Sequence, residues 1–449
     1  MDLLARDLAS VWHPAAQMAE WRDHPPLEVV AAEGSWLHLA DGRRVLDGIG
    51  SWWCKILGHR HPAVLAALAD QLGRFDHHLL AGCTNEPVVR LCERWLALAN
   101  RPVPGWFTKV FFADNGSTGV EVALKMALQW QAQAGERGRT RFAALEHAYH
   151  GETAGALSVT DLGRYRGPFA SMLTEPVRLG GLPVRSGAAD PRWQDAAAEW
   201  PSIQAQLDAE AGTLAAVVIE PVMQGAGGIR LHSPDLIRRL RGWCDVHGVL
   251  LIADEIAAGC WRLGEPLACH HAGVLPDIAV LAKGITAGVL PFSMVLATQR
   301  LYDGFLGTWA SGRAFLHSNT FAGHALGVAC AHAVLDVVEG SDLPARVVRS
   351  GERLRARLAD AARTRPWLAG VRGLGLAAAV DLRNRAGGHL DPAASTGWRA
   401  ARAATAAGCM LRPLGDTLYL MPPFTASDGE SDAMVDHLVA GADAAVAVL

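Results

Sequence analysis

Two short apolar segments, each followed by a charged residue, constrain what this chain can fold into more than any other feature of its sequence. The first runs from Gly248 to Ala253 and leads into Asp254, and the second runs from Asp277 to Ala282 and leads into Lys283. Such apolar runs are typical of strands that a parallel sheet buries on both faces. Because ligands of open parallel sheets bind beyond the carboxyl ends of the strands, we expect the carboxylate and the amine to face one ligand.

A lysine and a carboxylate at two strand ends suit pyridoxal phosphate (PLP). The lysine amine can hold the aldehyde of this cofactor as a Schiff base, and the carboxylate can keep its ring nitrogen protonated so that the ring accepts electrons. Each residue alone also has an ordinary explanation, because a carboxylate after a strand often caps a helix and a terminal lysine is usually solvated. The pair therefore needs support from other parts of a phosphate-cofactor site.

The composition describes a large globular protein with no sign of a nucleic-acid or membrane partner. Half of the 449 residues are hydrophobic, and the formal net charge is −4 with both signs interspersed. No uncharged apolar run reaches the length of a membrane span. The eight cysteines lack a C-x-x-C pair, which favours reduced thiols in a cytoplasmic protein. His147 and His150 lack ligand partners at metal-binding spacing, so we expect them to be hydrogen-bonded or surface histidines and predict no metal site.

The order of strand and helix patterns predicts how the chain is divided. Apolar strands alternate with amphipathic helices over residues 61–335, which predicts a large α/β domain with a mostly parallel sheet. Residues 1–60 contain a hairpin signal at Asp41-Gly42, and residues 336–449 have the pattern of a second α/β unit. We expect these N-terminal and C-terminal segments to form a smaller domain.

Further parts of a phosphate-cofactor site follow other predicted strands. Gly116 and Ser117 begin a helix, where free backbone N–H groups and the helix dipole suit a phosphate. Tyr149 follows the next strand and can stack on a cofactor ring. The glycine-rich turn from Gln224 to Gly228 is expected at the same edge of the sheet. Each feature alone is equally consistent with an ordinary helix cap, loop aromatic or turn.

Three more segments carry candidate residues. Trp52 and Trp53 are adjacent, and adjacent side chains on a strand point to opposite faces, so one is expected to pack inward while the other walls a cavity. On composition alone, both can equally be core or interface aromatics. The polar loop from Phe315 to Gly323 contains Ser318, Asn319 and Thr320, and its hydroxyls can cap the following helix or contact a phosphate. Arg412 is a bidentate carboxylate ligand if it faces the cleft, and otherwise an exposed arginine on a strand.

Several strings along the whole chain resemble the class III aminotransferases of PLP fold type I. The strings are Ser51-Trp52-Trp53, Tyr149-His150-Gly151-Glu152-Thr153, Ile219-Glu220-Pro221, Gln224-Gly225-Ala226-Gly227-Gly228, Leu251-Ile252-Ala253-Asp254-Glu255-Ile256, Arg412-Pro413 and Tyr419-Leu420-Met421-Pro422-Pro423. The Trp-Trp, Arg-Pro and Tyr-Leu-Met-Pro-Pro strings are similar to the branch that aminates 8-amino-7-oxononanoate to 7,8-diaminononanoate in biotin biosynthesis, with S-adenosylmethionine as amino donor. This resemblance implies a seven-stranded sheet in the large domain and a small domain built from both ends of the chain.

The resemblance also implies roles for residues of the cofactor site. By it, Lys283 carries PLP and moves the proton, and Asp254 pairs with the pyridine nitrogen. Gly116 and Ser117 hold the phosphate. Tyr149 stacks on the ring, with a part in catalysis and in substrate binding.

Other implied roles concern the substrate and a second subunit. Asn319 and Thr320 would reach the phosphate from a neighbouring subunit, together with Ser318, which is also implied to contact substrate. The family therefore implies a homodimer with shared active sites. Three further residues are implied to line the substrate pocket: Trp52, Trp53 and Arg412. The arginine would bind the carboxylate of the oxo acid.

One departure from the family pattern concerns the amino donor. After His13-Pro14, where the family often has a tyrosine that contacts the donor, this chain has Ala15. A class III ω-amino-acid, diamine or lysine-donor transaminase of the same fold therefore stays open as an alternative. A third hypothesis is an inactive PLP-binding or scaffold protein that keeps the dimer, although the retained Lys283, Asp254 and Arg412 argue against it.

Overall fold

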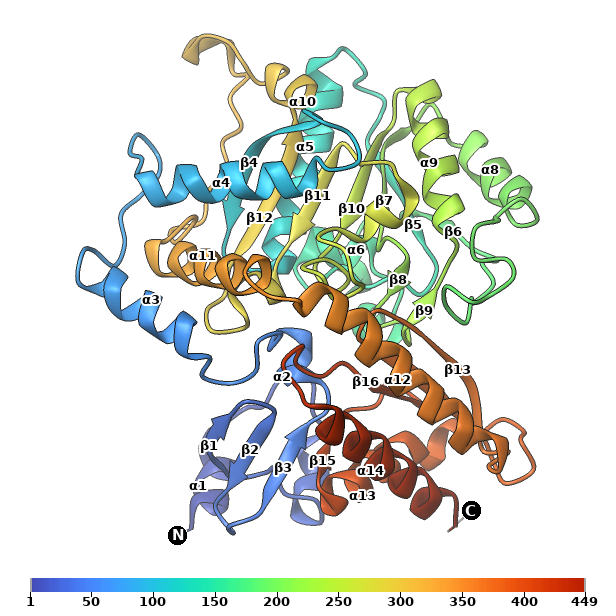
Figure 1. Cartoon of the computed structure of the whole chain (residues 1–449). Helices are drawn as coiled ribbons and strands as arrows, with labels where there is room; N and C mark the ends of the chain where they lie inside the picture. The colour runs from blue at the N-terminus through green and yellow to red at the C-terminus, as the bar shows by residue number, and fades with distance from the viewer. Residues whose placement is uncertain (1, 448–449) are drawn as a thin grey trace.

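The computed structural model describes residues 2–447, and its larger part is built around a seven-stranded sheet (Figure 1). The strand order is β4-β12-β11-β10-β7-β5-β6. Strand β12 runs antiparallel to both of its neighbours, and the other pairs are parallel, which confirms the predicted mostly parallel sheet. The strands are β4 (Phe107–Ala113), β5 (Arg141–Leu145), β6 (Val177–Leu179), β7 (Leu214–Ile219), β10 (Leu250–Asp254), β11 (Ile278–Leu281) and β12 (Ser293–Thr298).

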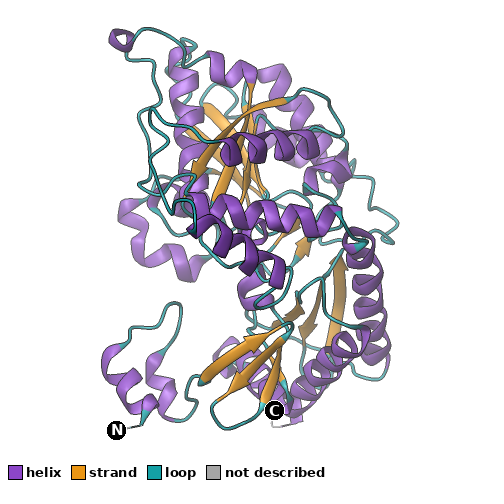
Figure 2. Cartoon of the chain, turned by 60° about the vertical axis from the view of Figure 1, so that its left-hand side comes forward, coloured by secondary structure: helices purple, strands orange, loops and turns teal. Residues whose placement is uncertain are grey.

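Successive residues of the central strands are buried on opposite faces of this sheet. Leu250 and Ile252 pack in the cluster that contains the apolar side of α5, whereas Leu251 and Ala253 pack in the cluster that contains α4, α9 and α11. Both faces are therefore dry, which explains why the sequence shows uninterrupted apolar runs there. Figure 2 shows helices on both sides of these strands.

The helices of this larger part connect the strands and cover the sheet. They are α3 (Pro62–Leu72), α4 (Glu86–Ala99), α5 (Gly116–Gln133), α6 (Ala154–Val159), α7 (Gly163–Arg166), α8 (Trp200–Asp208), α9 (Pro234–His247), α10 (Gln299–Asp303) and α11 (Ala325–Glu339). Short 3₁₀ segments are η2 (Gly167–Met172), η3 (Ala268–Ala272), η4 (Lys283–Thr286) and η5 (Trp309–Ser311), and a two-stranded ribbon joins β8 (Met223–Gln224) to β9 (Arg230–Leu231).

The two ends of the chain meet in smaller sheets. Strands β1 (Val29–Glu33), β2 (Trp36–Leu39) and β3 (Arg44–Asp47) form a sheet whose fourth strand is β15 (Cys409–Met410), parallel to β3. The Asp41-Gly42 signal correctly predicted the β2–β3 hairpin. A second sheet contains β13 (Leu368–Leu374), β14 (Ala377–Leu382) and β16 (Thr417–Leu420). The domain boundaries at residues 60 and 335 stay a prediction.

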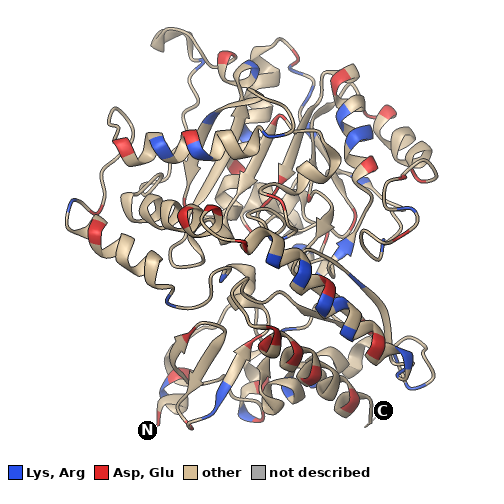
Figure 3. Cartoon of the chain, viewed as in Figure 1, with Lys and Arg blue, Asp and Glu red and all other residues tan. Residues whose placement is uncertain are grey.

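Six helical segments flank these smaller sheets, and two neighbouring ones carry opposite charges. The elements are α1 (Leu3–Ser10), η1 (Met18–Arg22), α12 (Leu343–Arg363), η6 (Pro392–Ala394), α13 (Thr396–Ala407) and α14 (Asp428–Ala447). Basic residues of α12 and acidic residues of α14 lie along neighbouring helices (Figure 3). Arg357, for example, pairs with Asp436 at 2.5 Å. No described helix is long and apolar enough to cross a membrane.

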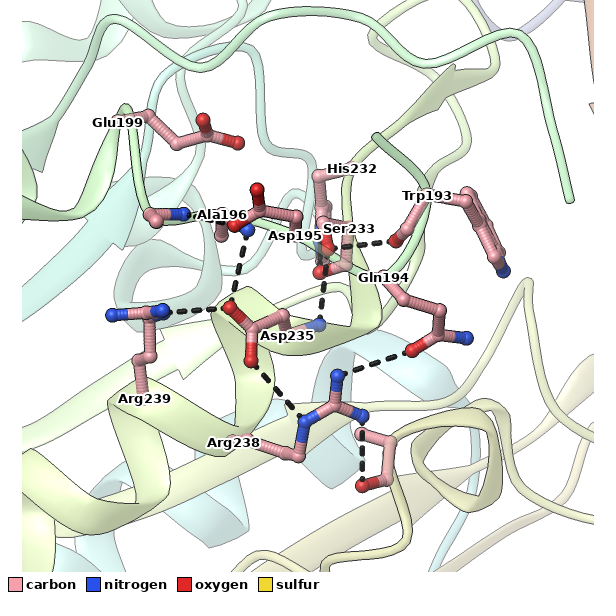
Figure 4. Close-up of polar contacts among 12 residues, drawn as sticks. Trp193, Gln194, Asp195, Ala196, Glu199, His232, Ser233, Asp235, Arg238 and Arg239 are labelled. Carbon is pink, nitrogen blue, oxygen red and sulfur yellow. Dashed lines mark hydrogen bonds and ion pairs between the residues drawn. The ribbon is translucent and has the colours of Figure 1, made fainter. Parts of the chain in front are cut away.

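A polar cluster fixes the start of α9, the helix that leads into β10 (Figure 4). The hydroxyl of Ser233 caps the helix by accepting from the backbone N–H of Asp235 at 3.1 Å, and it donates to the carbonyl of Trp193 at 2.7 Å. The Asp235 carboxylate accepts from the Ala196 N–H and from Arg239. The helix ends at His247 and is capped by Gly248, whose φ of 66° is left-handed, as a glycine allows. These contacts fix the two ends of the helix that precedes β10.

Candidate active site

A cavity of about 380 Å³ lies at the carboxyl ends of the central strands. Its wall includes Asp254, the last residue of β10, and Lys283, which follows the end of β11 by two positions. The first turn of α5, the segment 149–151 after β5, and the loop 288–292 complete much of the wall. The two strand-end groups that the sequence singled out therefore share one cavity of a size that suits a small organic ligand.

Asp254 is held by hydrogen bonds and is 4% exposed. Its Oδ2 accepts from the ring Nδ1 of His150 at 2.8 Å, and its Oδ1 accepts from the backbone N–H of Ile256 at 3.1 Å. Because a carboxylate can only accept, Nδ1 carries the proton in this contact. The other ring nitrogen of His150, Nε2, is buried with no partner among residues 2–447. His150 also lines the cavity, so sequence analysis missed a residue of the site.

The amine of Lys283 lies 5.1 Å from the centre of the Trp53 ring. Burial of this amine lowers its pKa from the ordinary 10.5, and the negative charges of Asp254 and Glu220 oppose that effect only in part. Within the described chain, no carboxylate oxygen is within 4.0 Å of the amine. A lysine whose pKa is lowered has a larger neutral, nucleophilic fraction near neutral pH than an exposed one.

Glu220 is a second buried carboxylate at the cavity and follows the end of β7. Its Oε2 accepts from the backbone N–H of Tyr149 at 3.0 Å, and its Oε1 accepts from the N–H of Gly225 at 2.9 Å. Burial raises its pKa to about 7, and the nearby charge of Asp254 adds to this effect while His150 opposes it. The sequence showed this residue only as part of a family string, with no sign of its role.

The start of α5 forms a tight cradle. Asn115 caps the helix, and the hydroxyl of Ser117 accepts from the backbone N–H groups of Glu152 and Thr153, each at 3.1 Å. A Cβ on Gly151 would lie 2.3 Å from that hydroxyl, so this approach requires glycine. A Cβ on Gly116 would likewise meet the side chain of Ile256 at 2.8 Å. Unpaired N–H groups at a helix N-terminus beside such a cradle suit a phosphate.

Tyr149 reaches the cavity from the segment that follows β5. Its hydroxyl donates to Glu152 at 2.9 Å, and its ring lies edge-on to that of Tyr165, with centroids 5.9 Å apart. Burial raises the pKa of this phenol, so it stays protonated at neutral pH. An aromatic ring, a phosphate cradle, a carboxylate and a lysine thus surround one space.

A comparison with known protein families covers nearly the whole chain. The family described as aminotransferase class-III matches residues 17–441. The chain belongs to the class III aminotransferases. The cofactor of this aminotransferase is pyridoxal phosphate.

Named relatives resemble the aminotransferase over nearly its whole length. The adenosylmethionine-8-amino-7-oxononanoate aminotransferase of Nitratidesulfovibrio vulgaris is 38% identical over 99% of this chain and 82% of its own. That of Geobacter sulfurreducens is 37% identical over 96% of this chain and 95% of its own.

Two solved structures resemble the aminotransferase closely. The Methanocaldococcus jannaschii structure of the same name is similar with a TM-score of 0.90 and 26% identity, covering 99% of this chain and 98% of the other. An amine transaminase from an uncultivated Pseudomonas species has a TM-score of 0.87 and 36% identity, covering 96% and 98%. The predicted PLP fold type I is confirmed.

The residues around the cavity fit pyridoxal phosphate. The cradle at Gly116 and Ser117 suits its phosphate, Asp254 suits a protonated ring nitrogen, and the Lys283 amine suits its aldehyde. The Nε2 of His150, which has no hydrogen-bond partner among the described residues, is a further buried polar atom next to Asp254. The donor set therefore matches the chemistry of each part of the cofactor.

The prediction that the two tryptophans lie on a strand was wrong. They lie in α2 (Gly50–Trp53), a turn in which all four residues have positive φ, from 44° to 75°, rather than on a strand. Trp53 is both the buried ring and the ring at the cavity, whereas Trp52 is 43% exposed. The turn is held by the buried carboxylate of Asp47, which accepts from Ser51 at 2.7 Å and contacts His59 at 2.9 Å. Such a turn has no simple sequence signal.

Four other predicted site residues lie outside this cavity. Ser318 and Thr320 are exposed, and Asn319 between them is half-buried. Arg412 is half-buried, with its guanidinium over the ring of Trp52 at 4.7 Å and its Nη2 donating to the carbonyl of Ala15 at 2.5 Å. Their roles at the phosphate and at the substrate carboxylate stay predictions.

Proposed function

We propose that this aminotransferase transfers an amino group from S-adenosylmethionine to 8-amino-7-oxononanoate, giving 7,8-diaminononanoate in biotin biosynthesis. The observation that carries the proposal is the similarity to relatives of that name across nearly the full chain. Arg412 supports it, because this guanidinium is half-buried and, among the described residues, has no carboxylate within 4.0 Å. Such a group suits the carboxylate of an incoming substrate.

The proposed roles at the cofactor follow from the cavity. Bound pyridoxal phosphate supplies a carbonyl that takes up an amino group and a ring that accepts electrons. Lys283 holds the cofactor until the donor arrives, and its amine then takes the proton from the donor carbon, a task that a lowered pKa favours. The carboxylate of Asp254 faces the ring nitrogen, oriented by the hydrogen bond from His150.

Other residues fix position. The N–H groups of Gly116 and Ser117 bind the phosphate, and Tyr149 stacks on the ring and contacts substrate. Glu220 orients this tyrosine through the hydrogen bond from its backbone N–H. In the second half-reaction the acceptor carboxylate binds Arg412 beside Trp52, which directs the ketone toward Lys283. The ring of Trp53, next to Trp52 in the chain, lies 5.1 Å from the amine of that lysine.

A homodimer is part of the proposal. The loops that carry Leu79 and Phe321 expose large apolar side chains, 56% and 55% of their surface respectively, and the rings of His77 and Phe321 lie 5.1 Å apart, so the two loops are neighbours. Trp309 and Leu316 are exposed further along the second loop. A partner that covers this face would bring Ser318, Asn319 and Thr320 into the interface. The free cysteines are consistent with the proposed cytoplasmic location.

The donor half-reaction tests the proposed function. The PLP-loaded protein is mixed separately with S-adenosylmethionine, lysine and putrescine, and the visible absorbance of the cofactor is followed in a single turnover. We expect S-adenosylmethionine to convert the absorbance to that of pyridoxamine phosphate, and subsequent 8-amino-7-oxononanoate to restore it. No response to S-adenosylmethionine, with a full response to lysine or putrescine, would remove it as donor.

Amine transamination with a different donor is the second candidate. Two observations favour it: Ala15 stands where the family often has a donor-contacting tyrosine, and a solved relative at 36% identity is an amine transaminase. The same experiment separates the two candidates, because only the donor differs between them.

A further inference from the structure

Trp398 is a half-buried tryptophan on α13 that the family strings did not include. The guanidinium carbon of Arg412 lies 5.0 Å from the centre of the Trp398 ring and 4.7 Å from that of Trp52. One arginine is thus packed against two indole rings that come from opposite ends of the chain. Cation–π contacts of this kind leave the N–H donors at the guanidinium edge free for a carboxylate.

The surroundings of Trp398 show what else holds it. On α13 the guanidinium of Arg402 lies 6.0 Å from the same ring, and Arg402 is ion-paired with Glu20 on η1. The charge of this second arginine is therefore balanced by a protein carboxylate. Arg412, in contrast, has only the neutral carbonyl of Ala15 as a hydrogen-bond acceptor among the described residues.

We propose that Trp398 is a positioning residue for Arg412 and so sets the affinity of the enzyme for acceptors that carry a carboxylate. The inference rests on the proposed function, in which Arg412 binds that carboxylate. Trp398 is not among the residues that line the cofactor cavity, so it acts on acceptor binding and leaves the chemical step unchanged. An arginine without this ring samples more rotamers, and binding must then order it.

Trp398→Leu tests the proposal, because leucine keeps an apolar group but removes the π face. We expect the KM for 8-amino-7-oxononanoate to rise about 5- to 30-fold, the range for a partly desolvated cation–π contact. We expect kcat to stay within about twofold, and the KM for hexanal, an acceptor without a carboxylate, to stay unchanged. Trp398→Phe, which keeps an aromatic face, should restore most of the affinity.

Two comparisons separate positioning from general packing. In an Arg412→Met background, Trp398→Leu should raise the KM no further, since its effect passes through the arginine. Trp130→Leu is the matched control, because Trp130 contacts Arg300 at the same 5.0 Å, outside the residues that line the cavity. It should leave both KM values unchanged.

Several outcomes would overturn the inference. An unchanged KM for 8-amino-7-oxononanoate in Trp398→Leu, with a raised KM in Arg412→Met, would refute the role of Trp398 and leave the role of Arg412 intact. An unchanged KM in Arg412→Met removes both this inference and the proposed carboxylate site. Equal effects on hexanal, or full additivity with Arg412→Met, would show that Trp398 only packs. If Trp398→Leu does not fold, Trp398→Met is tested in its place. The ratio of its KM for 8-amino-7-oxononanoate to its KM for hexanal is then compared with the ratio in the unsubstituted protein.

Discussion

Glu220→Gln tests whether burial of this carboxyl makes stability depend on pH. Burial raises the pKa of Glu220 to about 7 from an ordinary 4.5, which at about 1.36 kcal/mol per pKa unit corresponds to about 3 kcal/mol. The pKa is raised in the folded state, so burial favours the protonated carboxyl over the ionised one. The stability that this protonated form gives the folded protein, relative to the ionised form, is fully present below about pH 4.5 and is lost as the pH rises through about 7. Between about pH 5.5 and about pH 8.5, the carboxyl should lower the free energy of unfolding by about 2 kcal/mol.

The assay is urea unfolding of the cofactor-free protein at fixed protein concentration, at these two pH values. Without PLP, the pH dependence of cofactor binding does not contribute to the difference. Glu220→Gln should lose about 2 kcal/mol less than the unsubstituted protein over this range. The exposed Glu136→Gln, as control, should follow the unsubstituted protein. Equal pH slopes in the unsubstituted protein and in Glu220→Gln would refute the reasoning that burial dominates at this carboxyl.

The remaining predictions concern the cofactor. Lys283→Ala should lose the visible absorbance of bound PLP and at least about a thousandfold of turnover, and a variant that kept turnover would end the role of this lysine. Asp254→Asn, which cannot carry a negative charge, should reduce kcat by about a hundredfold in steady-state assays, with an unchanged circular dichroism spectrum. His150→Phe should weaken PLP binding by about tenfold in a fluorescence titration, since it removes a charge-assisted hydrogen bond to Asp254; unchanged affinity would contradict this. Removal of PLP should lower Tm in a thermal scan, and an equal Tm would show that the ligand does not favour the folded state.

The central strands and two of the groups at their ends could be predicted from the sequence because that information is local. Uninterrupted apolar runs identify β10 and β11, and the positions of Asp254 and Lys283 then follow from the geometry of a parallel sheet. The hairpin at Asp41-Gly42 was equally local, since that dipeptide favours the turn by itself.

The missed parts of the site depend on contacts between distant residues. His150 contacts Asp254 across 104 positions of the chain, and neither neighbourhood in the sequence indicates the other. Glu220 resembles any carboxylate after a strand until packing removes it from water. The antiparallel direction of β12 is likewise set by the path of the chain after Lys283, because an apolar strand has the same pattern in either direction.

The reversed winding at Gly50 to Trp53 has a consequence for how the two indoles are kept in place. Each non-glycine residue wound in this sense costs roughly 1–2 kcal/mol, so the segment on its own would unwind. Its shape is imposed from outside, by the carboxylate of Asp47 and by neighbours such as Lys55, whose amine donates to the carbonyl of Gly288 in the cavity wall. The position of the Trp53 ring in the cavity wall therefore depends on the residues that surround this turn, and a change in those residues will alter the cavity through that ring.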